Sequence, residues 1–137
     1  MLEIKNLTVK VKNNAPILTD VSLSIDEGTC IGLTGASGSG KTTLIKSIMG
    51  MNGGDLEIPQ GQILLDGDNL LTHSAKERRM LCGETIGFIP QNPMTAFFPH
   101  AKMERQIIET LRMHTGLDKK QAHALAENVL RKVNLTD

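Results

Sequence analysis

The chain has 137 residues, which is about the size of one domain. Charged residues make up 22% and apolar residues 39%, so the composition excludes a disordered tail. Fifteen basic and fifteen acidic side chains cancel, which argues against a dedicated nucleic-acid binder. No apolar run reaches the roughly 20 residues of a transmembrane helix, and the first ten residues lack the pattern of a signal peptide.

The first part of the chain is predicted to form strands. Apolar residues mostly alternate over 2–9 and alternate strictly over 21–25, as in half-buried strands. A turn cluster at 13–16 separates the two. A compact apolar strand is expected over 30–33, with Cys30 as a small core residue, because this cysteine has no metal-site spacing around it.

The remaining elements are predicted from apolar periodicity and from end signals. Short strands are expected over 63–65 and 86–89, and the second ends at a proline. A helix is expected over 42–49. The predicted polar helix 74–81 has Ser74 and Glu77 at capping-box spacing. Two further helices are expected over 102–115 and 118–133, the second capped by Asp118 and Gln121.

The strongest motif is GASGSGKT at 35–42, a full match to G-x-x-x-x-G-K-[ST]. Glycines let the backbone curl so that N–H groups over about 38–43 point into one concavity, and the following helix adds its positive dipole end. Lys41 can reach the β- and γ-phosphates, and the Thr42 hydroxyl can complete a Mg²⁺ shell. The predicted cofactor-binding residues are Gly35, Ala36, Ser37, Gly38, Ser39, Gly40, Lys41, Thr42 and Thr43.

This pattern predicts the binding of a nucleoside triphosphate with Mg²⁺. The alternative is a glycine-rich turn that binds nothing. The apolar run before the loop and the helix expected after it argue for binding, because this is the context in which the motif holds phosphates.

The segment IGFIPQNPMT at 86–95 resembles the Q-loop of ATP-binding cassette (ABC) transporter ATPases, and more narrowly that of the oligopeptide, dipeptide and nickel importer group. Segments 18–23 and 61–67 resemble the family's L-x-D-V-S-L and G-x-I-x-x-D-G strands. The resemblance implies an α/β fold: a P-loop NTPase core with an N-terminal antiparallel β subdomain and the start of a helical subdomain. It also implies truncation, with 1–99 as the nucleotide-binding core carrying Walker A and the Q-loop, 100–137 beginning the helical subdomain, and the C-terminal half of the cassette absent.

By the same resemblance, Gln91 is the Q-loop glutamine, a catalytic residue that reaches the Mg²⁺ and the attacking water. The alternative is a polar residue that merely ends a strand. Residues 92–100 would face a membrane subunit, and the Phe97–Phe98 pair suits a docking surface if exposed. Burial of both rings in the helical subdomain is the other possibility.

Several family features do not occur in the sequence. No signature motif, Walker B strand or switch histidine follows before Asp137, and no aromatic residue precedes Phe88 to stack on a base. Preference for ATP therefore rests on the resemblance alone. The histidines, all expected at the surface, are His73, His100, His114 and His123.

The resemblance implies the ATP-binding, energy-coupling subunit of an importer for peptides, nickel or a metal chelate. Its partners would be ATP, transmembrane permease subunits and a second ABC ATPase subunit in a head-to-tail dimer, at the cytoplasmic face of the membrane. The parent protein would hydrolyse ATP, whereas these residues alone would hold Mg-ATP without turnover. The alternatives are a non-catalytic nucleotide-binding fragment of a non-transporter ABC ATPase and, less favoured, a P-loop kinase or GTPase.

Overall fold

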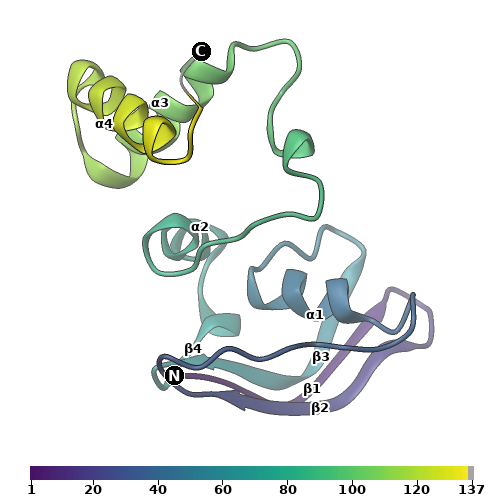
Figure 1. The fold of residues 1–137 in the computed structure, drawn as a ribbon. Coiled ribbons are helices and arrows are strands. Elements are labelled where there is room, and N and C mark those ends of the chain that lie inside the picture. The colour runs from purple at the N-terminus through teal and green to yellow at the C-terminus, as the bar shows by residue number, and fades with distance from the viewer. Residues whose placement is uncertain (136–137) are drawn as a thin grey trace. The chain divides into compact units, whose positions relative to one another are not determined.

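The computed structural model describes residues 1–135 and divides into two compact units at the Leu81–Cys82 peptide (Figure 1). Each unit is described by itself. Within the described residues, none of the helices combines the length and the apolar character needed to cross a bilayer.

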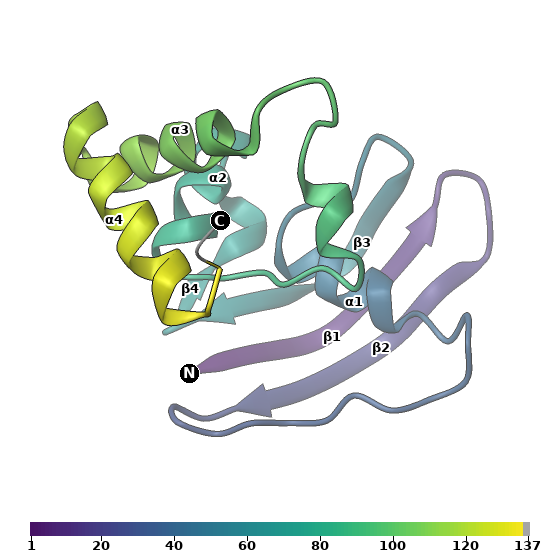
Figure 2. The same ribbon diagram turned by 45° about the horizontal axis from the view of Figure 1, so that its top comes forward.

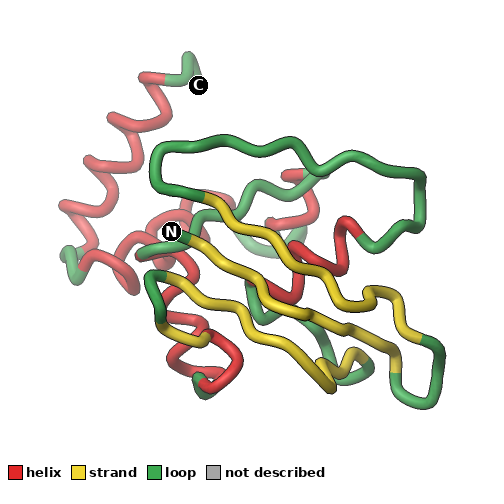
Figure 3. Tube along the Cα trace, turned by 90° about the horizontal axis from the view of Figure 1, so that it is seen from below, coloured by secondary structure: helices red, strands yellow, loops and turns green. Residues whose placement is uncertain are grey.

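The first unit is built on a four-stranded antiparallel sheet in the order β2-β1-β3-β4. Figure 3 shows the three long strands side by side, and helix α1 lies across one face of the sheet (Figure 1). The predicted strands over 2–9, 21–25 and 63–65 are confirmed as parts of longer strands. The elements of the sheet and the helix on it are β1 (Leu2–Val11), β2 (Pro16–Ile25), β3 (Leu56–Leu65), β4 (Asp68–Asn69) and α1 (Lys41–Ile48).

The apolar face of the sheet depends on a bulge in β1. Ile4 and Leu7 are both buried, although residues three apart in a regular strand point to opposite faces. Asn6 lies between them in the left-handed region with φ 49°, and the pairing register shifts there. The extra residue therefore returns Leu7 to the face that Ile4 occupies.

A second left-handed residue, Asp20 with φ 53°, lies opposite this bulge in β2. The Asn6 side-chain amide donates to the Asp20 carboxylate over 2.7 Å. On the other side, Gly61 of β3 has φ 111°, and a Cβ there would lie 2.5 Å from the Leu7 Cα. The bulge thus runs across three strands and leaves room only for glycine in β3.

The core between the sheet and α1 is apolar. Leu44 of α1 and Met49 after it are buried. The one buried polar side chain among the described residues is Ser47, whose hydroxyl donates to the Thr43 carbonyl over 2.8 Å, so its burial leaves no group unsatisfied. The buried residues that the sheet and its following turn contribute are Ile4, Leu7, Val9, Leu18, Ile63 and Leu70.

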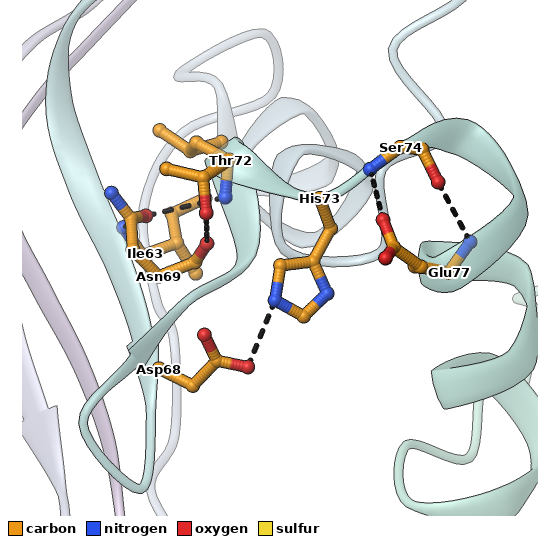
Figure 4. Close-up of polar contacts among 8 residues, drawn as sticks. Ile63, Asp68, Asn69, Thr72, His73, Ser74 and Glu77 are labelled. Atoms are coloured by element: carbon orange, nitrogen blue, oxygen red, sulfur yellow. Dashed lines mark hydrogen bonds and ion pairs between the residues drawn. The ribbon is translucent and has the colours of Figure 1, made fainter.

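Asn69 organises the chain that leaves the sheet (Figure 4). Its side-chain oxygen accepts from the Ile63 N–H at 3.4 Å and from the Leu71 N–H at 3.2 Å, and so caps the short 3₁₀ helix η1 (Leu70–Thr72). The Thr72 hydroxyl donates back to the Asn69 carbonyl. These contacts tie β3, β4 and η1 together.

Helix α2 (Ala75–Glu84) starts with the predicted capping box, which is confirmed (Figure 4). The Ser74 N–H donates to the Glu77 carboxylate at 2.7 Å, and the Glu77 N–H donates to the Ser74 hydroxyl at 3.3 Å. Hydrogen bonding of the Glu77 carboxylate to Ser74, first to its side chain and then to its backbone N–H, lowers the pKa of Glu77 below its ordinary value. The backbone leaves helical geometry at Cys82 and Gly83.

Two predicted strands are wrong as paired strands. Over 30–33 the described structure has no strand, and Cys30 is exposed rather than in the core. Over 86–89 there is a single bridge, between Ile86 and Cys82, while Ile89 is 91% exposed. An apolar run forms a buried strand only beside hydrogen-bonding neighbours. Among the described residues, the run 30–33 has no strand partner and the run 86–89 has only the bridge at Ile86.

The second unit is mainly helical (Figure 2). After η2 (Pro93–Ala96) come α3 (Met103–Thr115) and α4 (Lys119–Lys132), which pack together and bury Ile108 and Ala122. The predicted capping box of Asp118 and Gln121 at α4 is confirmed. Both helices lie inside the predicted ranges.

Two of the four histidines differ from the predicted surface position. The His73 side chain is 20% exposed and its Nε2 lies 2.8 Å from the Asp68 carboxylate (Figure 4). His114 is half-buried, and its ring lies so close to Gly83 that an added Cβ there would be 2.7 Å from it. Both rings fill space beside the start or end of a helix, which apolar periodicity does not reveal.

Replacing Gly61 by alanine tests the bulge. The variant should lose about 1–2 kcal/mol for the left-handed backbone and about 1–3 kcal/mol more for the collision with β1. Gly67→Ala is the matched control, because Gly67 has φ 86° and open space around it, so only the backbone cost applies. Urea unfolding of the intact protein measures both, and equal losses in the two variants would contradict the close approach.

Candidate functional site

The predicted phosphate loop lies between β2 and α1 as an exposed turn with a buried end. Residues 35–39 are exposed, whereas Gly40 is buried. Gly35, Gly38 and Gly40 have φ of 150°, 81° and 91°, all on the positive side that favours glycine. The Ser39 N–H donates to the Ala36 carbonyl at 3.3 Å and closes the turn.

Gly40 fixes this loop against the sheet. A Cβ on Gly40 would lie 2.6 Å from the Leu18 Cδ2 and 3.3 Å from the Ile17 Cγ2, both in β2. Any other residue would have to displace the buried Leu18 side chain, and the φ of 91° at this position itself favours glycine. The motif predicts a glycine here for the curl of the loop, but the contact with β2 cannot be read from its spacing.

The N-terminus of α1 is open to a ligand. Gly40 is its N-cap and offers no side-chain acceptor, and the first turn contains no acidic residue. The first helical hydrogen bond runs from the Leu44 N–H to the Gly40 carbonyl at 2.8 Å. Among the described residues, no acceptor is hydrogen-bonded to the N–H groups of Lys41, Thr42 or Thr43. Such uncapped donors at the positive end of a helix suit an anion.

The Lys41 side chain folds back across the loop. Its ammonium group donates to the carbonyls of Gly35 and Ala36, each at 2.7 Å, and to the Ser39 hydroxyl at 3.3 Å. The positive charge is therefore held above the turn by three neutral oxygens. Because these partners carry no charge, an anion at the loop would be a stronger acceptor for the same ammonium.

The remaining predicted site residues fall into two places. The Thr42 side chain is exposed beside the loop, and Thr43 is half-buried behind it. Gln91 is exposed in the second unit, directly before Asn92, whose side chain caps η2 by accepting from the Met94 N–H at 3.2 Å. The structure thus gathers residues 35–43 into one site, while Gln91 belongs to the other unit.

The second unit has an open cleft of about 650 Å³ between α3 and the segment that follows η2. Phe97 is half-buried at its edge and Phe98 is 75% exposed. The sequence left open exposure of the pair or burial of both rings, and neither describes both residues. Gln106 of α3 hydrogen-bonds to the backbone N–H and carbonyl of Phe98. No sequence signal predicts this residue as part of a surface. The cleft is lined by Ala96, Phe97, Phe98, Gln106, Ile107, Glu109, Thr110, Leu111 and Met113.

Comparison with solved structures gives the fold. The chain superposes on an ATP-binding cassette solved as a dimer in a post-hydrolysis state bound to ADP and Pi, with a TM-score of 0.79 and 22% identity. The match covers 96% of this chain and 56% of that one. The fold is therefore that of an ABC ATPase cassette, with the predicted antiparallel sheet and the start of the helical subdomain.

Comparison with curated proteins finds importer subunits. The chain is 35% identical to the dipeptide transport ATP-binding protein of Lactococcus lactis subsp. cremoris and 31% identical to the oligopeptide transport ATP-binding protein of Haemophilus influenzae. It is 30% identical to the metal-staphylopine import system ATP-binding protein of Staphylococcus aureus. All of this chain is covered in each case, but it spans only 40%, 43% and 51% of the three relatives.

A family model described as "ABC transporter" matches residues 18–137. That span includes the glycine-rich loop, α1 and all of the second unit. The chain therefore belongs to the ABC transporter family.

Proposed function

We propose that this chain contains the nucleotide-binding site of the ATP-binding subunit of an ABC importer, and that residues 35–43 bind the triphosphate of ATP. The observation that carries the proposal is the set of uncapped N–H groups at the start of α1, beside a lysine held only by neutral oxygens. Backbone donors at a helix N-terminus and a mobile ammonium are what a polyphosphate requires.

Phosphate binding would use the donors that the loop already presents. The N–H groups of residues 38–43 would surround the β-phosphate, with the Ser39 N–H first leaving the Ala36 carbonyl. The Lys41 ammonium would exchange the Gly35 and Ala36 carbonyls for phosphate oxygens. This exchange costs little reorganisation, because the side chain already lies over the loop. The positive φ values of the loop glycines keep the concavity free of side chains.

Mg²⁺ is the cation proposed to accompany ATP. The two residues proposed to hold it, Thr42 and Gln91, are each exposed and each offer an oxygen, the ligand type that a hard cation prefers. Within the described residues no three His, Cys, Asp or Glu side chains gather as a metal site. Bound Mg²⁺ would neutralise phosphate charge, and Gln91 would also hold the attacking water during hydrolysis in the whole protein.

The wider function follows from the relatives and belongs to the same proposal. Residues 1–99 would form the nucleotide-binding core, and 100–137 would begin the helical subdomain. The relatives are named for dipeptide, oligopeptide and metal-staphylopine transport, so we propose a peptide or metal-chelate importer, with nickel as a further cargo. A second ATPase subunit would complete a head-to-tail dimer.

The proposed membrane partner is a permease subunit that contacts the cleft of the second unit at the cytoplasmic face. Phe98 and the other apolar side chains of the lining suit an amphipathic helix, because a large exposed apolar group gains most from being covered by a partner. ATP binding in the first unit and permease contact in the second would then be separate tasks of one chain.

Lys41→Ala tests whether the loop at 35–43 binds the phosphates of ATP. With Mg-ATP at about 100 times its Kd, the intact protein should be stabilised by about 2.7 kcal/mol, and the variant should lose most of this stabilisation. Lys46→Ala is the matched control, since Lys46 is an exposed lysine in the last turn of the same helix. Thermal unfolding with and without Mg-ATP measures the stabilisation of both variants. If Mg-ATP raises the unfolding temperature of Lys41→Ala as much as that of the unaltered protein, the proposal is contradicted.

Thr42→Val tests the metal role separately. Loss of the hydroxyl should weaken binding of Mg-ATP about tenfold, since one ligand interaction is worth about 1.4 kcal/mol, and should leave binding of ATP in EDTA unchanged. Thr43→Val makes the same chemical change one residue further along, where the side chain is half-buried. Calorimetric titration compares the variants; an equal loss with and without Mg²⁺ would remove Thr42 from the metal shell.

A further inference from the structure

Among the described residues, the Gln106 side chain of α3 hydrogen-bonds to the segment that follows η2, residues 97–102. Its carbonyl oxygen accepts from the Phe98 N–H at 2.8 Å. Its amide nitrogen donates to the Phe98 carbonyl at 3.1 Å and to the Ala101 carbonyl at 2.9 Å. One primary amide thus satisfies both backbone groups of Phe98, as a neighbouring strand would, and a third group beyond it.

Apart from the half-buried Phe97, packing holds little of this segment. Phe98 is 75% exposed, and residues 99–102 are exposed as well. The other backbone contacts are local turns, from the Phe97 N–H to the Met94 carbonyl at 3.4 Å and from the Ala101 N–H to the Phe98 carbonyl at 3.1 Å. Hydrogen bonds to Gln106 therefore determine where the exposed Phe98 ring stands relative to α3.

Gln106 is itself well anchored. Its N–H donates to the Lys102 carbonyl at 3.3 Å, and its carbonyl accepts from the Thr110 hydroxyl at 2.9 Å, so the residue is fixed in the first turns of α3. The cleft beside it is lined by Phe98 on one side and by Ile107 and Met113 on the other.

We infer that Gln106 is a positioning residue for the permease contact: it holds Phe98 at the mouth of the cleft in the orientation that the partner meets. This inference rests on the proposed function, because the partner is the proposed permease subunit. An exposed aromatic ring that is already ordered raises affinity for the partner, because the entropy cost of immobilising the segment is not added to the free energy of binding.

Gln106→Glu is the sharpest variant. A carboxylate of nearly the same size can still accept from the Phe98 N–H, but it cannot donate to the Phe98 and Ala101 carbonyls. Gln106→Leu is the second variant and removes all three bonds without placing a charge there. The control is Gln121→Leu, which removes a helix-capping bond in α4, at the Asp118 N–H, away from the Phe98 segment.

The test uses the intact protein and its permease subunits in detergent. In both Gln106 variants, the Phe98 amide should exchange with solvent at least about tenfold faster, and affinity for the permease should fall about tenfold, as expected for the loss of one to two net hydrogen bonds. Affinity for Mg-ATP should not change. Gln121→Leu should lower the unfolding temperature and leave both the Phe98 exchange and the permease affinity as in the parent protein.

Three outcomes would overturn the inference in distinguishable ways. Unchanged Phe98 exchange in a folded variant would show that Gln106 does not order the segment. Faster exchange with unchanged permease affinity would reduce Gln106 to a local structural role. If the unaltered protein itself fails to bind the permease, the proposed function fails, and the inference fails with it.

Discussion

The close approach of Gly40 to β2 is the contact on which the sheet, the loop and α1 all depend. With no Cβ at this position, the start of the helix lies against the Leu18 and Ile17 side chains. An added Cβ would lie 2.6 Å from the Leu18 Cδ2, and the φ of 91° also favours glycine. The same residue leaves the helix without a side-chain cap. Packing and ligand affinity are therefore coupled: the residue that seats α1 on the sheet also keeps its first N–H groups available to an anion.

The sheet meets this requirement through its bulge. The left-handed residues Asn6 and Asp20 shift β1 and β2 by one position, so that Ile4, Leu7 and Leu18 face the same side and can cover α1. Gly61 allows β3 to follow the bulge at backbone contact. The position of the phosphate loop thus depends on residues far from it in the sequence.

Local signals made much of the structure predictable. The motif at 35–42 and the capping boxes at Ser74 and Asp118 involve partners at most six residues apart, so the sequence alone indicates them. The apolar runs 30–33 and 86–89 were misleading, because a strand requires a neighbour and apolarity does not supply one. The bulge at Asn6 was also missed, because its hydrogen-bonding and strand partners lie 14 residues or more away in the sequence. The apolar and polar residues of β1 alternate only approximately, which did not by itself indicate a bulge.

In the candidate site, the chemistry of the lysine and glycines follows from residue type, but two contacts do not. Neither the contact of Gly40 with β2 nor the hydrogen bonding of Gln106 to Phe98 has a sequence pattern, because each joins a residue to a partner outside its own helix. A side-chain amide such as that of Gln106 can hydrogen-bond to almost any backbone group, so the partner is determined by the folded structure and not by residue type.

The most direct test of the central claim is site-resolved amide hydrogen exchange in the intact protein, with and without saturating Mg-ATP. If the uncapped N–H groups at the start of α1 hold the phosphates, the amides of residues 38–43 should become protected about tenfold or more, whereas those of β1 should change little. ATP binding with no protection at 38–43 would contradict the account, because the nucleotide would then be held without the donors that the loop presents.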